Sequence, residues 1–251
     1  MSVQAVLDGQ NVLVTGGCSG LGLAMALTFQ RAGARVAVFD RTIPTGFDKA
    51  HPDLVLIAGD VSDPVSVKEG FGAAQSILGR LDAVIANAGI SQNRPTLDLD
   101  FAEWRRVMSI NLDGAFLTCY EAGRLMSASG GGSIILTASM YGVVAAPERL
   151  GYCVSKSGTV MMTKALAIEW AQLGIRVNAI APGYVRTPFV EELVALGRLD
   201  LEKLEQRTPM GRLITPEEVA DAACFLISDA ARAITGQIIG IDGGWTAYGY
   251  L

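Results

Sequence analysis

The stretch Asn11-Val-Leu-Val-Thr-Gly-Gly-Cys-Ser-Gly-Leu-Gly22 decides the fold of this chain. Its first five residues are mostly apolar and predict a short buried strand. The loop that follows leads into a helical segment, and its glycines permit a tight turn and close packing of helix on strand. Because a helix N-terminus favours an anion, the loop predicts a phosphate-binding site. The predicted binding residues are Gly16, Ser19, Gly20, Leu21 and Gly22.

Similar short apolar runs recur along the chain and are separated by segments with helical periodicity. Some are continuously apolar, such as residues 12–14 and 83–86, which is typical of parallel strands covered on both faces. This alternation predicts an α/β fold, a doubly wound Rossmann-type parallel sheet of seven strands with helices on both faces. The predicted strands span residues 11–15, 35–40, 54–59, 81–87, 133–138, 175–182 and 237–241.

No linker, repeat or low-complexity segment divides the 251 residues, so we expect a single domain over residues 1–251. The least regular stretch, residues 183–212, lies between a predicted strand and a helix that Pro216 can begin. A long insertion at such a place often covers a ligand. We therefore predict a substrate lid at residues 184–212.

Composition excludes several classes of protein. Half of the residues are hydrophobic and 18% are charged, which argues against disorder, and there is no apolar stretch of membrane-spanning length. The net charge of -5 and the absence of a dense Lys/Arg run make nucleic acid an unexpected partner. Residues 1–10 contain no secretory signal pattern, so a cytoplasmic location is expected.

The cysteines and the histidine exclude other kinds of site. The four cysteines are widely scattered and match neither a redox pair nor a metal-ligand pattern, so we expect free thiols and no metal. His51 is the only histidine and lies in a polar stretch, away from every segment with catalytic character. A Ser-His-Asp hydrolase is therefore not expected.

An acidic residue ends the second predicted strand, 18 positions after the glycine loop. The Asp40 carboxylate can accept hydrogen bonds from a ribose 2′-hydroxyl and repel a 2′-phosphate, which favours NAD over NADP. Arg41 keeps NADP as the less favoured alternative, because a guanidinium can hold that phosphate. Asp60 and Val61 follow the third strand and are expected to border the adenine, although Asp60 can instead cap a helix beginning near Ser62.

Tyr152 and Lys156 stand one helical turn apart, and Ser139 precedes Tyr152 by 13 positions. Residues at i and i+4 project from one helix face, so a phenol and an ammonium can share one site. A nearby cation favours phenolate, and lowering a tyrosine pKa from about 10 to about 7 requires ~4 kcal/mol. We therefore predict that Lys156 lowers the pKa of Tyr152 and also holds the nicotinamide ribose.

This set of residues admits a reaction between an alcohol and a ketone. Tyr152 takes the substrate hydroxyl proton while a hydride leaves carbon for the nicotinamide, and it returns the proton in the reverse direction. Ser139 is expected to stabilise the substrate oxygen, and Asn111 to hold a water that links Lys156 to solvent. Each residue also has a purely structural alternative: a packed Tyr/Lys pair, a turn cap at Ser139 and a helix bend at Asn111.

The chain resembles the short-chain dehydrogenase/reductase family over nearly its whole length. The motifs that carry the resemblance are Thr15-Gly16-x-x-x-Gly20-x-Gly22, Asn87-Ala88-Gly89, Asn111 within Asn-Leu-Asp-Gly, Ser139, Tyr152-x-x-x-Lys156, and Pro182-Gly183 leading to Thr187. The resemblance implies that Asn87, Ala88 and Gly89 line the cofactor cleft. It implies further that Thr187 contacts the nicotinamide carboxamide and that residues 180–185, including Pro182, Gly183 and Val185, border that ring. It also implies a homotetramer in which helices near residues 104–127 and 152–173 pair with a neighbour.

Three loops are expected to choose the substrate: residues 90–97, 140–151 and 184–212. Their polar members suit several hydroxyls or an anionic substituent, and their apolar members can flank a ring or carbon chain. The polar candidates are Gln92, Asn93, Arg94, Glu148 and Arg149, and the apolar ones are Met140, Tyr141 and Val143. We predict a small-molecule substrate, namely a polyol, sugar or cyclic hydroxy compound.

Two other functions remain as alternatives. A 3-oxoacyl-thioester reductase would use the same motifs, but Asp40 counts against it because such reductions in this family commonly use NADPH. A non-catalytic dinucleotide-binding sensor is the alternative of another class. The intact set of Ser139, Tyr152 and Lys156 counts against a sensor, since binding alone needs no proton-transfer residues.

Overall fold

The computed structural model describes residues 6–249. The two ends of the predicted 1–251 domain, and the first half of the segment inspected for a secretory signal, lie outside the described residues. Seven parallel strands form one sheet in the order β3-β2-β1-β4-β5-β6-β7, which confirms the predicted fold class. The strands are β1 Asn11–Thr15, β2 Arg35–Asp40, β3 Val55–Ala58, β4 Ala83–Ala86, β5 Gly132–Thr137, β6 Ile175–Pro182 and β7 Ile238–Ile241.

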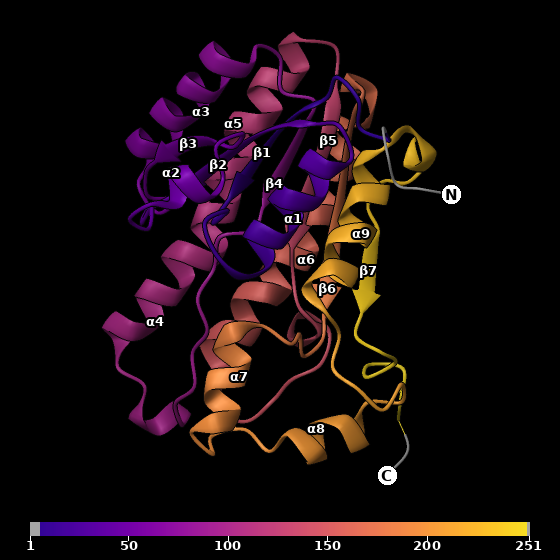
Figure 1. Cartoon of the computed structure of the whole chain (residues 1–251). Helices are drawn as coiled ribbons and strands as arrows, with labels where there is room; N and C mark the ends of the chain where they lie inside the picture. The colour runs from indigo at the N-terminus through magenta and orange to yellow at the C-terminus, as the bar shows by residue number, and fades with distance from the viewer. Residues whose placement is uncertain (1–5, 250–251) are drawn as a thin grey trace.

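Helices cover both faces of this sheet (Figure 1). They are α1 Gly20–Arg31, α2 Phe47–Ala50, α3 Pro64–Leu78, α4 Phe101–Met108, α5 Gly114–Ala128, α6 Leu150–Trp170, α7 Pro188–Ala195, α8 Leu201–Arg207 and α9 Pro216–Ile227. On one face, α1 and α9 bury Phe29 and Val219 against Val14 of β1. On the other face, α3 and α5 bury Phe71 and Met126 together with Leu13 of β1. Successive strand residues are thus buried on opposite faces, which explains the continuous apolar runs.

The start of α3 shows whether Asp60 caps this helix, one of the two roles that the sequence left open for it. Asp63 is the N-cap of this helix, and its side chain accepts a hydrogen bond from the Val65 backbone. Asp60 instead accepts hydrogen bonds from the backbone and hydroxyl of Ser62, at 2.9 and 2.7 Å. The alternative that Asp60 caps the helix is therefore wrong, because the helix begins three residues later than that alternative requires.

The segment 183–212 is more regular than the sequence indicated. It contains α7 and α8, which lie together beyond the lower end of the sheet in Figure 1. Thr187 caps α7 and Asp200 caps α8, each accepting a backbone hydrogen bond through its side chain. Helices of 8 and 7 residues have too few turns to give a clear periodic pattern. The predicted start of the next helix at Pro216 is confirmed.

Two further expectations from the sequence concern the cysteines and membrane-spanning helices. All four cysteines are free, as predicted. Within residues 6–249, no helix is both long and apolar enough to cross a membrane.

The strand order reverses between β1 and β4, which are neighbours in the sheet although β2 and β3 separate them in sequence. At such a reversal the loops after the strands diverge and leave a crevice, where ligands of doubly wound sheets bind. The Thr15 hydroxyl, at the end of β1, accepts hydrogen bonds from the backbone of Asn87 and Ala88 at 3.0 and 3.2 Å. The glycine loop and the Asn87–Gly89 run are thereby fastened to each other at the crevice.

Candidate active site

A cavity of about 700 Å³ opens at the carboxyl ends of the strands. Apart from residues 180 and 181 of the range 180–185, which are buried in the sheet, every residue predicted to bind or border the cofactor lines it, and so do three of the four residues predicted to be catalytic. These lining residues are Gly16, Ser19, Gly20, Leu21, Gly22, Asp40, Asp60, Val61, Asn87, Ala88, Gly89, Ser139, Tyr152, Lys156, Pro182, Gly183, Val185 and Thr187. The fold therefore brings together side chains that are up to 171 positions apart in sequence.

The glycine loop forms a cradle that fits a dinucleotide pyrophosphate. Gly16 has a φ of +65°, and a methyl group on Gly22 would overlap the carbonyl oxygen of Gly16. Ser19 is the N-cap of α1, yet its side chain makes no capping hydrogen bond within the described chain, so N–H groups of the first turn are free for an anion. A methyl group on Gly20 would meet no atom within 4 Å, which leaves open space above the loop.

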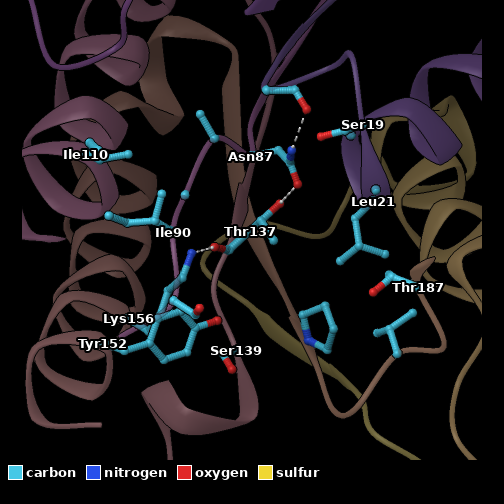
Figure 2. Close-up of a pocket in the computed structure, with 18 of the residues that line it drawn as sticks. Ser19, Leu21, Asn87, Ile90, Ile110, Thr137, Ser139, Tyr152, Lys156 and Thr187 are labelled. Atoms are coloured by element: carbon cyan, nitrogen blue, oxygen red, sulfur yellow. Dashed lines mark hydrogen bonds between the residues drawn. The ribbon is translucent and has the colours of Figure 1, made fainter. Parts of the chain in front are cut away.

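Asn87 joins this cradle to the end of strand β5 (Figure 2). Its amide nitrogen donates to the carbonyls of Thr15 and Gly16 at 3.1 and 3.3 Å, and its amide oxygen accepts from the Thr137 hydroxyl at 3.3 Å. Sequence reasoning named Asn87 but missed Thr15 and Thr137 as its supports. The available signal was a threonine at the end of each of two apolar strands.

The adenosine end of the cavity is acidic. The two oxygens of the Asp40 carboxylate accept hydrogen bonds from the backbone of Cys18 and Thr42, at 3.0 and 3.1 Å. Arg41 lies 3.9 Å from Asp60 and is largely exposed. Burial, together with the charge of Asp40, raises the pKa of the Cys18 thiol to about 11. Asp40 thus both faces the cavity and fixes the conformation of the glycine loop.

Helix α6 presents Tyr152 and Lys156 to the cavity, as their spacing predicted (Figure 2). The Lys156 ammonium donates to the Thr137 carbonyl at 2.6 Å and lies 5.8 Å from the centre of the Tyr152 ring. Burial lowers the pKa of Lys156 to about 8. Burial also raises the pKa of Tyr152, while a hydrogen bond with Ser139 and the charge of Arg149 lower it. The Lys156 ammonium is bonded to a carbonyl, and the lowering of the Tyr152 pKa by Lys156 stays a prediction.

Ser139 caps a turn, as one of its two predicted roles requires, and its predicted contact with the substrate oxygen stays a prediction. It is the N-cap of a short 3-10 turn, Met140–Gly142, and its hydroxyl oxygen accepts a hydrogen bond from the Tyr141 backbone at 3.1 Å. It also lines the cavity beside Tyr152 (Figure 2). The Tyr141 backbone uses a lone pair of the Ser139 oxygen and leaves its proton, and the Ser139 hydroxyl is also hydrogen-bonded with Tyr152, where it lowers the pKa of the phenol.

Asn111 lies behind the cavity and does not line it. It sits in a π-helical turn, Ser109–Asp113, between α4 and α5, a feature that often marks a functional region. Its side chain exchanges hydrogen bonds with the Ile90 backbone at 2.8 and 2.9 Å and donates to the Ser155 hydroxyl at 3.2 Å. Its predicted role as the holder of a water next to Lys156 stays a prediction; the Asn111 amide oxygen and the Lys156 ammonium both lie beside Gly89. The hydrogen bonds make Asn111 a positioning residue for Ile90, which lines the cavity.

An aromatic wall borders the cavity beyond Ser139. The hydroxyls of Tyr141 and Tyr184 are 3.0 Å apart, and the Tyr184 ring packs edge-on against Trp245 at 5.4 Å. The Arg149 guanidinium lies over the Tyr141 ring, 5.4 Å from its centre. Sequence reasoning named Tyr141 and Arg149 as loop residues but had no means of joining them to Trp245, which is about 100 positions away.

Several residues predicted to contact the substrate are turned elsewhere. Gln92 is 2% exposed, and its amide oxygen accepts from the Gly151 backbone at 3.0 Å. Arg94 pairs with Glu103 at 2.6 Å. These two residues, together with Glu148 and Val143, do not line the main cavity, whereas Asn93, Met140, Tyr141 and Arg149 do. Spacing along a loop cannot predict which of its side chains turn inward, because loops have no fixed period.

Comparison with known proteins agrees with this geometry. A family model described as enoyl-(acyl carrier protein) reductase matches residues 16–246. Cis-4-hydroxycyclohexanecarboxylate dehydrogenase of Sinomonas cyclohexanicum is 40% identical over 243 residues, covering 94% of this chain and 96% of the relative. D-threitol dehydrogenase of Mycolicibacterium smegmatis is 39% identical over 249 residues, covering 96% and 94%. The crystal structure of levodione reductase matches with a TM-score of 0.90 at 33% identity, covering 97% of this chain and all of the other.

Proposed function

The chain belongs to the short-chain dehydrogenase/reductase family, and from this membership we propose that it interconverts a secondary alcohol and a ketone with NAD. One observation carries the proposal. The hydroxyls of Ser139 and Tyr152 and the ammonium of Lys156 line the same cavity as the glycine cradle. A nicotinamide dinucleotide, when bound, supplies the acceptor or donor of the hydride.

In this proposal Tyr152 moves the proton at its phenolic oxygen. As a phenolate it accepts the proton of the substrate hydroxyl during oxidation, and as a phenol it returns that proton to the carbonyl oxygen during reduction. Ser139 donates a hydrogen bond from its hydroxyl to the substrate oxygen and stabilises the charge that develops there. Lys156 uses one N–H on the Thr137 carbonyl, which leaves two donors to hold the nicotinamide ribose.

The preference for NAD rests on Asp40. Its carboxylate lines the adenosine end of the cavity, where it can accept from a ribose 2′-hydroxyl and repel a 2′-phosphate. Arg41, the residue that could hold such a phosphate, lies 3.9 Å from the Asp60 carboxylate and is partly neutralised by it. The position of Asp40 and the ion pair of Arg41 with Asp60 both favour NAD over NADP.

For the substrate we propose a polyol, sugar or cyclic hydroxy compound. The names of the relatives support this class, since one acts on a hydroxycyclohexanecarboxylate and another on D-threitol. The wall of Tyr141 and Tyr184 offers flat faces and hydroxyls to such a molecule. Reduction of a 3-oxoacyl thioester is the competing reaction, and a dinucleotide sensor without turnover is the competing function.

The test is a comparison of NAD and NADP reduction across polyols, sugars, cyclic alcohols and 3-hydroxyacyl thioesters, with product ketones identified by mass spectrometry. We expect NAD-linked oxidation of a polyol or cyclic alcohol. Turnover confined to acyl thioesters with NADP would favour the competing reaction. Tight dinucleotide binding with no turnover of any compound would favour the sensor.

Three further features belong to the same proposal. A homotetramer through α5 and α6 is supported by apolar side chains exposed on these helices, including Phe116 and Ile168, and light scattering would measure the mass. The lid at residues 184–212 is supported by Val190, Leu193 and Leu199, which line the cavity.

A cytoplasmic location remains the expectation from the sequence.

A further inference from the structure

Arg149 is a cation at the substrate end of the cavity whose guanidinium has no acidic partner among residues 6–249. It is half-buried, lines the cavity and lies over the Tyr141 ring. No side-chain hydrogen bond and no ion pair involves its guanidinium in the described chain, whereas the neighbouring Arg94 is paired with Glu103. Tyr141 supports the flat face of the group through a cation–π contact, which leaves the N–H donors at its edge unused.

The charges that line the cavity are divided between its two ends. Two carboxylates, Asp40 at the end of β2 and Asp60 after β3, lie at the adenosine end together with one cation, Arg41. The remaining cations, Arg106, Arg149 and Lys156, belong to α4 and to the start and first turns of α6. Arg149 is also close enough to Tyr152 to lower the pKa of its phenol. The substrate end therefore has a net positive charge and favours an anionic ligand.

The backbone around Arg149 is held in a defined conformation. Glu148 has a φ of +63°, a left-handed conformation that a residue with a side chain rarely adopts. Its carbonyl accepts hydrogen bonds from the Arg94 backbone at 2.7 Å and from the buried Gln92 amide at 3.4 Å. The same Gln92 side chain accepts from the Gly151 backbone at 3.0 Å. Backbone strain of this kind persists where surrounding contacts hold it, and it is concentrated at binding sites.

We propose that Arg149 is a specificity-determining residue that selects secondary alcohols bearing a carboxylate, so that the substrate is a hydroxy acid. This inference rests on the proposed function, because it names the substrate class of the same site. A guanidinium offers a planar fork that matches the two oxygens of a carboxylate, and such a pair is stronger than a hydrogen bond to a neutral hydroxyl. The clamped backbone places that fork before the substrate arrives, which lowers the entropy cost of binding.

A binding experiment tests the carboxylate site without requiring turnover. Cyclohexanecarboxylate and cyclohexanecarboxamide have nearly the same shape and differ in charge, and neither has a hydroxyl to oxidise. Calorimetry on the full chain with NAD should show about 10-fold or tighter binding of the carboxylate. Arg149→Met should abolish this preference and Arg149→Lys should keep part of it. Arg105→Met, an exposed arginine of α4 outside the cavity, is the matched control and should leave the preference unchanged.

The outcomes separate this inference from the proposed function. The inference is overturned if the wild type binds both compounds alike, if the preference survives Arg149→Met, or if Arg106→Met removes it instead. Parallel kinetics compare 4-hydroxycyclohexanecarboxylate with cyclohexanol. Oxidation of cyclohexanol without any carboxylate preference would retain the proposed function and reject the role of Arg149. Carboxylate binding that depends on Arg149, with no oxidation of any alcohol, would retain the anion site and reject the proposed function.

Discussion

The two ends of the cavity are built differently. The adenosine end is made from strand ends and backbone groups between residues 15 and 61, with Asp40 fastened to the Cys18 and Thr42 backbone. The substrate end is made from side chains of separate loops, such as Tyr141 and Tyr184, whose hydroxyls contact each other, and Trp245 packs against Tyr184 outside the cavity lining.

This difference has a consequence for substitution. A backbone cradle depends on glycines and on main-chain hydrogen bonds, so most side-chain changes leave it in place. A wall of side chains changes its chemistry with each residue that is replaced. We therefore expect substitutions at the adenosine end to alter the choice of dinucleotide, and substitutions at the substrate end to alter the choice of alcohol. Tyr152 and Lys156 lie where the two ends meet, and their replacement should have the largest effects.

Tyr152→Phe should give the largest loss. Removing the phenolic oxygen removes the group that exchanges a proton with the substrate, which we expect to lower kcat by about 1000-fold or ~4 kcal/mol. Steady-state kinetics and dinucleotide titration would measure both effects, and the Kd of NAD should change little. Tyr141→Phe, which removes a hydroxyl from the aromatic wall, is the control and should lower kcat only a few-fold. Equal losses in the two variants would place proton transfer elsewhere.

Lys156→Met should change how stability depends on pH. Burial lowers the pKa of Lys156 to about 8 from its ordinary 10.5, so between these values the unfolded chain binds more protons than the folded chain. The stability of the wild type should therefore rise with pH across this window, by up to ~3 kcal/mol from this residue. Urea unfolding at pH 7.5, 9 and 10 should show the variant lacking that rise. Parallel curves for the two proteins would mean that Lys156 titrates normally.

Asp40→Asn should affect the adenosine end alone. The amide loses the negative charge that repels a 2′-phosphate, so we expect the ratio of kcat/KM for NAD over NADP to fall about 10- to 30-fold, or ~2 kcal/mol. The KM for the alcohol should stay the same. Asp53→Asn, which changes an exposed carboxylate just before β3 that does not line the cavity, is the matched control and should leave the cofactor ratio unchanged. An unchanged cofactor ratio in Asp40→Asn would mean that this carboxylate does not contact the ribose.

Tyr184→Phe should give the smallest change and should be confined to the substrate end. It removes the hydrogen bond with Tyr141 but keeps the ring that packs against Trp245. We expect a rise of a few-fold in the KM for the alcohol, corresponding to ~1 kcal/mol. Dinucleotide titration should show no change. A weaker affinity for NAD in this variant would contradict the division of the cavity into two ends.

The sequence predicted the sheet well, and it named residues that line the adenosine end of the cavity, because both depend on local patterns. Strands buried on both faces appear as apolar runs, and the loop that ends in Gly22 has few conformations open to it. All seven strands were placed within two residues of their observed bounds.

The substrate end was predicted less well, because its contacts join distant segments. Gln92 was expected to contact substrate but is buried as a clamp between two loops, and the hydrogen bonds of Asn111 with the Ile90 backbone were not foreseen. The pKa of Tyr152 depends on burial, which the i, i+4 spacing with Lys156 does not reveal. Such features follow from tertiary packing and cannot be read from spacing alone.

The most direct test of the central claim follows a single hydrogen atom. A cyclic secondary alcohol deuterated at the carbinol carbon would be incubated with the protein and NAD, and both products would be analysed by mass spectrometry. We predict one ketone for each reduced dinucleotide formed, with the deuterium on the dinucleotide. The reaction should also be slower than with the undeuterated alcohol. Ketone formation with the deuterium released to water, or reduction of NAD without a ketone, would contradict the account.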